Sequence, residues 1–201
     1  TNLPIILSSG MSTLDEVSEA LDTVGFFSGH PTILLITTSQ YPTPPKDVNL
    51  MKFHTLSKKF PDLILGFSDH TIGPIASSLA CVLGAVFFEK HFTLDCNLQG
   101  PDHWFSANPE QLKIWRDSII TSFEMLGDPT VKPTKHELKN KKEFQRIVLA
   151  KKIINKGELF TDENLEMKRV SGGNGLSGKM YDKLLGIKAT KNFKKGNKIE
   201  L

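Results

Sequence analysis

Short apolar runs recur through the first part of the chain, and small polar residues follow each of them. The runs lie at Pro4–Leu7, Thr32–Thr37, Leu63–Phe67 and Val86–Phe92. Their length and composition predict buried strands. Helical patterns separate them: a Thr13–Glu16 capping box opens one amphipathic stretch, and Asn108-Pro109 opens another that ends at Gly127. The alternation of strands and helices predicts a parallel α/β fold.

We expect three segments along the chain. Residues 1–127 hold four βα units, which is half of an eight-stranded (β/α)₈ barrel. Residues 128–142 are rich in Pro, Lys and Thr without periodicity, which is typical of a linker. Residues 143–201 contain two similar stretches, Ala150–Gly157 and Ala189–Gly196, at an offset of 39 residues. They predict a small, pseudo-symmetric, β-rich module.

Composition narrows the class of protein. The 201 residues are 39% hydrophobic and 23% charged, which is typical of a globular chain. No apolar run is long enough for a membrane span, and no leader opens the chain, so we expect a cytoplasmic protein without membrane contact. The tail is basic, which fits a solvated surface, a lid over an anionic site or nucleic-acid binding. No aromatic ladder or nucleic-acid motif supports the last alternative.

Two histidines 21 residues apart are the strongest chemical signal. His70 and His91 each close a predicted strand, and the segment between them is long enough for a helix, which makes a βαβ unit. Parallel strand ends meet at one edge of a sheet, so the two imidazoles can converge on one divalent ion. Two nitrogen ligands leave open positions, which favours a catalytic metal. Many oxygen partners would suit Mn²⁺ or Mg²⁺, with zinc and iron as alternatives.

Other candidates lie at strand ends or in loops. Hydroxyls at these turns suit phosphate or carboxylate groups. Asp102, in the loop Gly100–Ser106, could bind a polyol or form an Asx-turn. Arg169 precedes the glycine-rich loop 171–175 and suits a sugar or acid substrate.

Several motifs, in the right order, resemble the N-acetylneuraminate (sialic acid) and legionaminate synthases. They are Ile5–Met11, Tyr41–Pro44, Gly66–Thr71, Glu89–Asp95 and Gly100–His103. The tail, with Lys156-Gly-Glu158, Asn164-Leu165 and Lys168-Arg169, resembles the antifreeze-like (SAF) domain of these enzymes. The resemblance implies the C-terminal half of a (β/α)₈ TIM barrel over 1–127, followed by an SAF domain over 143–201. The first barrel half would precede Thr1.

The same resemblance implies a reaction and a role for each site residue. The family condenses phosphoenolpyruvate with an N-acylmannosamine-type sugar into a nine-carbon 2-keto-3-deoxy acid, with a metal that polarises the sugar aldehyde. The implied metal ligands are His70 and His91. The implied phosphoenolpyruvate contacts are Ser8, Ser39 and Ser68. The implied sugar contacts are Tyr41, Asp102 and Arg169, the last reaching the partner's barrel in a domain-swapped homodimer. Glu89 is the candidate acid–base residue.

Two departures from the family pattern bear on these roles. Ser39 stands where the family often has an asparagine, so a contact to phosphoenolpyruvate would be shorter or water-mediated. After Arg169 the chain reads Val-Ser-Gly-Gly and not Pro-Gly. The alternatives are a truncated, non-catalytic remnant that binds metal or sugar, and a 3-deoxy-ulosonate phosphate synthase. We expect negligible synthase activity from the isolated chain, because a half barrel exposes two sheet edges.

Overall fold

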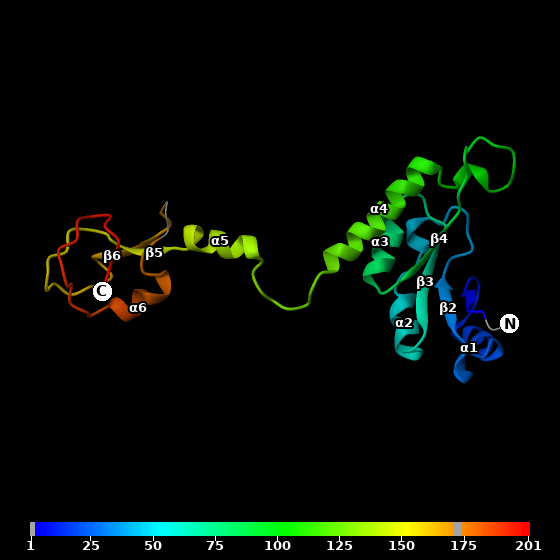
Figure 1. The fold of residues 1–201 in the computed structure, drawn as a ribbon, viewed down its shortest axis with the longest axis horizontal. Coiled ribbons are helices and arrows are strands. Elements are labelled where there is room, and N and C mark those ends of the chain that lie inside the picture. The colour runs from blue at the N-terminus through cyan, green and yellow to red at the C-terminus, as the bar shows by residue number, and fades with distance from the viewer. Residues whose placement is uncertain (1–2, 171–173) are drawn as a thin grey trace. The chain divides into compact units, whose positions relative to one another are not determined.

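The computed structural model describes residues 3–170 and 174–201, which form two compact units, 1–129 and 130–201 (Figure 1). Each unit is described by itself. Residues 171–173 of the predicted glycine-rich loop lie outside the described residues.

The first unit is built on a four-stranded parallel sheet. Its strands pair in chain order and are β1 (Ile5–Ser8), β2 (Thr32–Ile36), β3 (Ile64–Asp69) and β4 (Phe87–Lys90). Its helices are α1 (Leu14–Thr23), α2 (Lys52–Lys59), α3 (Ile75–Val82) and α4 (Pro109–Leu126), with short 3₁₀ turns η1 (Phe26–Ser28), η2 (Pro45–Asp47) and η3 (His103–Phe105). The predicted capping box at Thr13 and the predicted start of α4 at Asn108-Pro109 are both confirmed. The parallel α/β architecture of this part is therefore as expected.

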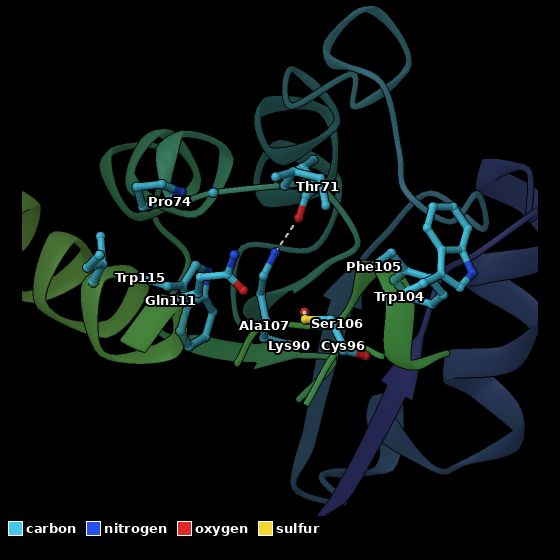
Figure 2. Close-up of a pocket in the computed structure, with 13 residues that line it drawn as sticks. Thr71, Pro74, Lys90, Cys96, Trp104, Phe105, Ser106, Ala107, Gln111 and Trp115 are labelled. Carbon is cyan, nitrogen blue, oxygen red and sulfur yellow. Dashed lines mark hydrogen bonds between the residues drawn. The ribbon is translucent and has the colours of Figure 1, made fainter. Parts of the chain in front are cut away.

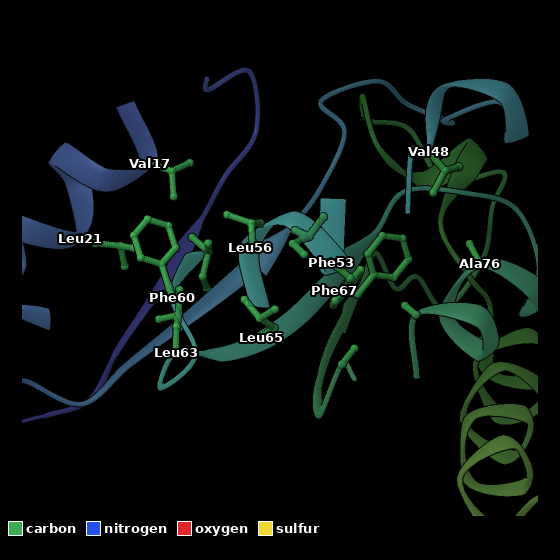
Figure 3. Close-up of a cluster of buried hydrophobic side chains, with 14 residues drawn as sticks. Val17, Leu21, Val48, Phe53, Leu56, Phe60, Leu63, Leu65, Phe67 and Ala76 are labelled. Atoms are coloured by element: carbon green, nitrogen blue, oxygen red, sulfur yellow. The ribbon is translucent and has the colours of Figure 1, made fainter. Parts of the chain in front are cut away.

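Strand alternation divides the sheet into two faces with different roles. Leu34 and Ile36 of β2 and Leu65 and Phe67 of β3 pack with α1, α2 and α3 in one buried core (Figure 3). Because successive side chains point to opposite faces, Ser68 and Glu89 point to the other face. The second face would be the interior of a closed barrel, and it carries the candidate chemistry.

The second unit is small and β-rich. Its elements are α5 (Lys135–Phe144), β5 (Ile147–Ala150), β6 (Leu165–Lys168), η4 (Gly178–Met180) and α6 (Tyr181–Leu184). Ile154 and Phe193 exchange two backbone hydrogen bonds of 2.9 and 2.8 Å. The amides of Gly157 and Gly196 donate to the carbonyls of Ala189 and Ala150, each at 2.7 Å. These matched bonds confirm the predicted pseudo-symmetry of the repeat.

Helix α5 occupies most of the segment that we predicted as a linker, 128–142. Thr134 accepts a hydrogen bond from the Glu137 amide, and the Glu137 carboxylate accepts one from the Thr134 amide. This capping box opens a helix with almost no apolar stripe, so hydrophobic periodicity could not reveal it. Among the described residues, no helix is long and apolar enough to span a membrane.

Candidate functional site

The candidate site lies where β3 and β4 end, beside the loop that follows β2. Parallel pairing sets Ser68 opposite Glu89 and Asp69 opposite Lys90, so His70 and His91 are the next residues on neighbouring strands. Their ring centroids lie 5.3 Å apart, with the ring planes 77° from parallel. The predicted convergence of the two imidazoles is therefore present.

Hydrogen bonds orient the His70 imidazole. Its Nδ1 lies 2.8 Å from the Thr38 carbonyl oxygen and donates to it, and the Thr37 hydroxyl lies 3.3 Å from the same nitrogen. This arrangement leaves the lone pair of the neutral ring on Nε2. Burial lowers the pKa of His70 and so favours the neutral imidazole; the Thr38 carbonyl opposes that shift, and the neighbouring His91 adds to it.

Ser68 and Glu89 lie directly beside His70. The Ser68 hydroxyl donates to Glu89 Oε1 at 2.6 Å, and its oxygen lies 3.3 Å from His70 Nε2. A hydroxyl has only one proton to donate. When that proton is directed at Glu89, the Nε2 lone pair of His70 faces an oxygen and not a donor.

Two further aromatic rings enclose the histidines. The Tyr41 ring lies 4.3 Å from the His70 ring and 5.4 Å from the His91 ring. The buried Phe105 ring lies 4.9 Å from His91 and 5.4 Å from Tyr41. Tyr41 is 47% exposed, so part of its ring is open to solvent. Sequence reasoning named Tyr41 but missed Phe105, whose approach depends on the path of a loop.

The remaining candidates of the first unit have contacts of their own. Ser8 ends β1, which lies three positions from β4 in the sheet, and it pairs with Leu35 of β2. A Cβ placed on Gly10 would lie 2.4 Å from the Ser39 hydroxyl, so Ser39 packs against the turn that follows β1. Asp102 is exposed at the start of η3, where its carbonyl accepts a hydrogen bond from Ser106.

Arg169 belongs to the second unit. Its Nε donates to the Phe144 carbonyl at 2.7 Å, and its guanidinium lies 5.5 Å from the centre of the Phe144 ring. These contacts hold the side chain within its own unit.

Comparison with known proteins identifies the family. The model of the NeuB family matches residues 1–131. The chain belongs to the NeuB family. It is 43% identical over 196 residues to the N,N'-diacetyllegionaminic acid synthase of Campylobacter jejuni, covering 96% of this chain and 58% of that enzyme. It is 36% identical over 197 residues to the pseudaminic acid synthase of the same organism, covering 98% of this chain and 56% of that enzyme.

A solved structure shows the same relation. The spore coat polysaccharide biosynthesis protein SpsE of Bacillus subtilis superimposes with a TM-score of 0.61 at 30% identity, covering 99% of this chain and 60% of that chain. This NeuB-family chain therefore spans little more than half the length of the relatives that it matches.

The comparisons correct one part of the predicted fold and identity. The family model matches residues 1–131 and ends before the small β-rich module. The family match therefore lies in the N-terminal part of this chain, which holds the barrel-like sheet. The α/β class and the parallel half-barrel sheet are supported. The prediction of a C-terminal synthase portion, with the second half of a (β/α)₈ barrel and an SAF domain, is wrong.

Proposed function

We propose that this NeuB-family chain supplies the metal- and sugar-binding face of a nonulosonic acid synthase. The reaction would join the enol carbon of phosphoenolpyruvate to the aldehyde carbon of an N-acylmannosamine-type sugar, with addition of water and loss of phosphate. The observation that carries the proposal is the convergence of His70, His91 and Tyr41 at neighbouring strand ends. The named activities of its relatives support the substrate class.

The histidine pair fits a divalent ion in part. His70 presents an Nε2 lone pair without a committed donor, and His91 lies in ring contact with it. The described residues form no cluster of three or more His, Cys, Asp or Glu side chains suited to a metal, so water and substrate oxygens would complete the coordination of Mn²⁺ or Mg²⁺. When bound, such an ion would polarise the sugar aldehyde as a Lewis acid.

The chain's own groups have separate tasks in this proposal. Glu89, which accepts a hydrogen bond of 2.6 Å from the Ser68 hydroxyl, is the candidate acid–base residue. Ser8, Ser39 and Ser68 would contact phosphoenolpyruvate. Tyr41 and Asp102 would contact the sugar. A homodimer that brings a second copy's Arg169 to the sugar, and a cytoplasmic location, rest on the family resemblance.

Manganese titration tests the metal site. We expect His70→Ala and His91→Ala each to weaken Mn²⁺ binding at least about 100-fold in isothermal titration calorimetry, because each removes one of two nitrogen ligands. His54→Ala, on the exposed side of α2, is the matched control and should bind as the unaltered chain does. Unchanged Mn²⁺ affinity in either of the first two variants would count against the assignment.

A second assay tests the reaction itself. Phosphate release from phosphoenolpyruvate should depend on added N-acetylmannosamine and on Mn²⁺, and Glu89→Gln should abolish it. Because the chain spans little more than half of its relatives, we expect its turnover to be negligible beside that of an intact synthase, so phosphate release is followed over long incubations. Phosphate release that is equally fast without the sugar would contradict the condensation.

A further inference from the structure

Asp69 and Lys90 occupy equivalent places at the ends of neighbouring strands. They are opposite each other in the β3–β4 register, and each directly precedes a histidine of the pair. Strand alternation turns both side chains toward the helix-covered face, away from Ser68 and Glu89. Their side chains are 0% and 6% exposed, and the Lys90 ammonium lies 3.4 Å from Asp69 Oδ2. A buried ion pair therefore lies directly behind the candidate site.

The Asp69 carboxylate is fully engaged by groups from three elements. Its Oδ1 accepts hydrogen bonds from the amide and the hydroxyl of Thr71, both at 2.8 Å. Its Oδ2 accepts from the Ser77 hydroxyl of α3 at 2.6 Å and from the Trp115 indole of α4 at 3.0 Å. These bonds anchor the end of β3 to both helices.

The Lys90 ammonium contacts backbone carbonyls on both sides of His70. Its ammonium donates to the Thr71 carbonyl, the contact drawn as a dashed line in Figure 2, and lies 3.4 Å from the Asp69 carbonyl. Asp69 and Thr71 are the residues that flank His70. The lysine that precedes His91 therefore holds the peptide groups that carry His70.

We propose that Asp69 and Lys90 are positioning residues, which set the spacing and orientation of the His70 and His91 imidazoles for the metal. The pair of histidines has no direct hydrogen bond to each other among the described contacts, so their separation follows from the two strand ends that carry them. A buried ion pair is weak evidence for a stabilising role, because desolvation offsets the attraction between the charges. Its place between the two backbones favours a geometric role. The metal-related part of this inference rests on the proposed function, and the geometric part does not.

The test replaces Lys90 and reads the site in two ways. Lys90→Met keeps the length of the side chain and removes its charge and donors. We expect Mn²⁺ affinity to fall about 10- to 100-fold by calorimetry, as for other supports behind metal ligands. We also expect the NMR through-space contacts between the His70 and His91 rings to weaken in the metal-free protein. Lys113→Met, which breaks an exposed ion pair with Asp117 on α4, should change neither.

The outcomes separate positioning from simple stabilisation. Both measurements are made where circular dichroism shows the variant to be folded. A folded Lys90→Met variant with unchanged affinity and unchanged ring contacts would overturn the inference. If Lys90→Met does not fold, Ser77→Ala removes one donor to Asp69 and should weaken Mn²⁺ binding by a smaller factor, about 2- to 10-fold; an unchanged affinity there would overturn it as well. If the unaltered chain binds no Mn²⁺, the proposed function fails, and the ring contacts alone decide whether Asp69 and Lys90 position the pair.

Discussion

Replacement of Gly66 by alanine tests how tightly the sheet beneath the site is packed. Gly66 lies within β3, between Leu35 of β2 and Phe87 of β4. A Cβ at this position would lie 2.5 Å from Leu35 Cδ2, 2.7 Å from the Phe87 carbonyl oxygen and 3.0 Å from Phe87 Cβ. Leu35 can rotate, but the Phe87 carbonyl belongs to the neighbouring backbone. The methyl group can therefore be accommodated only if β3 and β4 separate.

The expected cost follows from this geometry. Overpacking a well-filled site costs about 1–3 kcal/mol, and a backbone contact places Gly66→Ala in the upper part of that range. An unfolding entropy of about 2.1 cal/mol/K per residue over a unit of this size converts a loss of about 2–3 kcal/mol into a fall of about 7–11 °C in melting temperature. The strand shift would also move His91 relative to His70, so Mn²⁺ affinity should fall together with stability.

Urea unfolding measures the free energy of unfolding of Gly66→Ala directly. Both tryptophans, Trp104 and Trp115, lie in the first unit, so their fluorescence reports on the unit that contains Gly66. Leu35→Ala removes the side-chain contact but keeps the backbone contact, so Gly66→Ala should cost less in the Leu35→Ala background than in the unaltered chain, but it should still cost stability. A Gly66→Ala free energy of unfolding within about 0.5 kcal/mol of the unaltered chain would refute the reasoning.

Three further predictions concern the two units. Trp115→Phe should lower the free energy of unfolding by about 1–3 kcal/mol in circular dichroism, because it removes a buried donor to Asp69 and Ser77; no loss would show that these bonds are dispensable. Phe160→Ala, at a 1% exposed site in the second core, should cost about 3–5 kcal/mol by NMR-monitored unfolding, and a cost below about 1 kcal/mol would contradict its burial. In chelator-treated protein, the free energy of unfolding should fall as the pH drops below 6.5, because burial lowers the pKa of His70 and the unfolded chain therefore binds the proton first. His70→Gln should reduce this dependence of the unfolding free energy on pH. An unreduced dependence would show that His70 is not its source.

Local patterns were enough to predict the elements. The capping box at Thr13 and the Asn108-Pro109 start of α4 are signals within four residues, and both were read correctly. The repeat in the tail predicted matched turns, and Gly157 and Gly196 both take positive φ there, 87° and 82°. Helix α5 was missed because its capping box precedes a polar helix.

The expected SAF domain rested on short motifs in the tail, and the match to the family model over residues 1–131 does not extend to them.

Other features depended on contacts that no local pattern encodes. Phe105 reaches His91 only because of the path of a loop, and Trp115 reaches Asp69 across 46 residues of chain. Asp69 and Lys90 did carry a signal, because each precedes a histidine.

The sequence by itself determined the parallel α/β elements, their caps and the placing of two histidines at strand ends, because side-chain periodicity and capping act over a few residues. Only the tertiary structure decided that the imidazoles lie 5.3 Å apart beside Tyr41, with the Nδ1 of His70 bonded to Thr38. That arrangement follows from the register of β3 and β4 and from contacts between residues more than 20 positions apart, which hydrogen bonding and packing set only once the chain has folded.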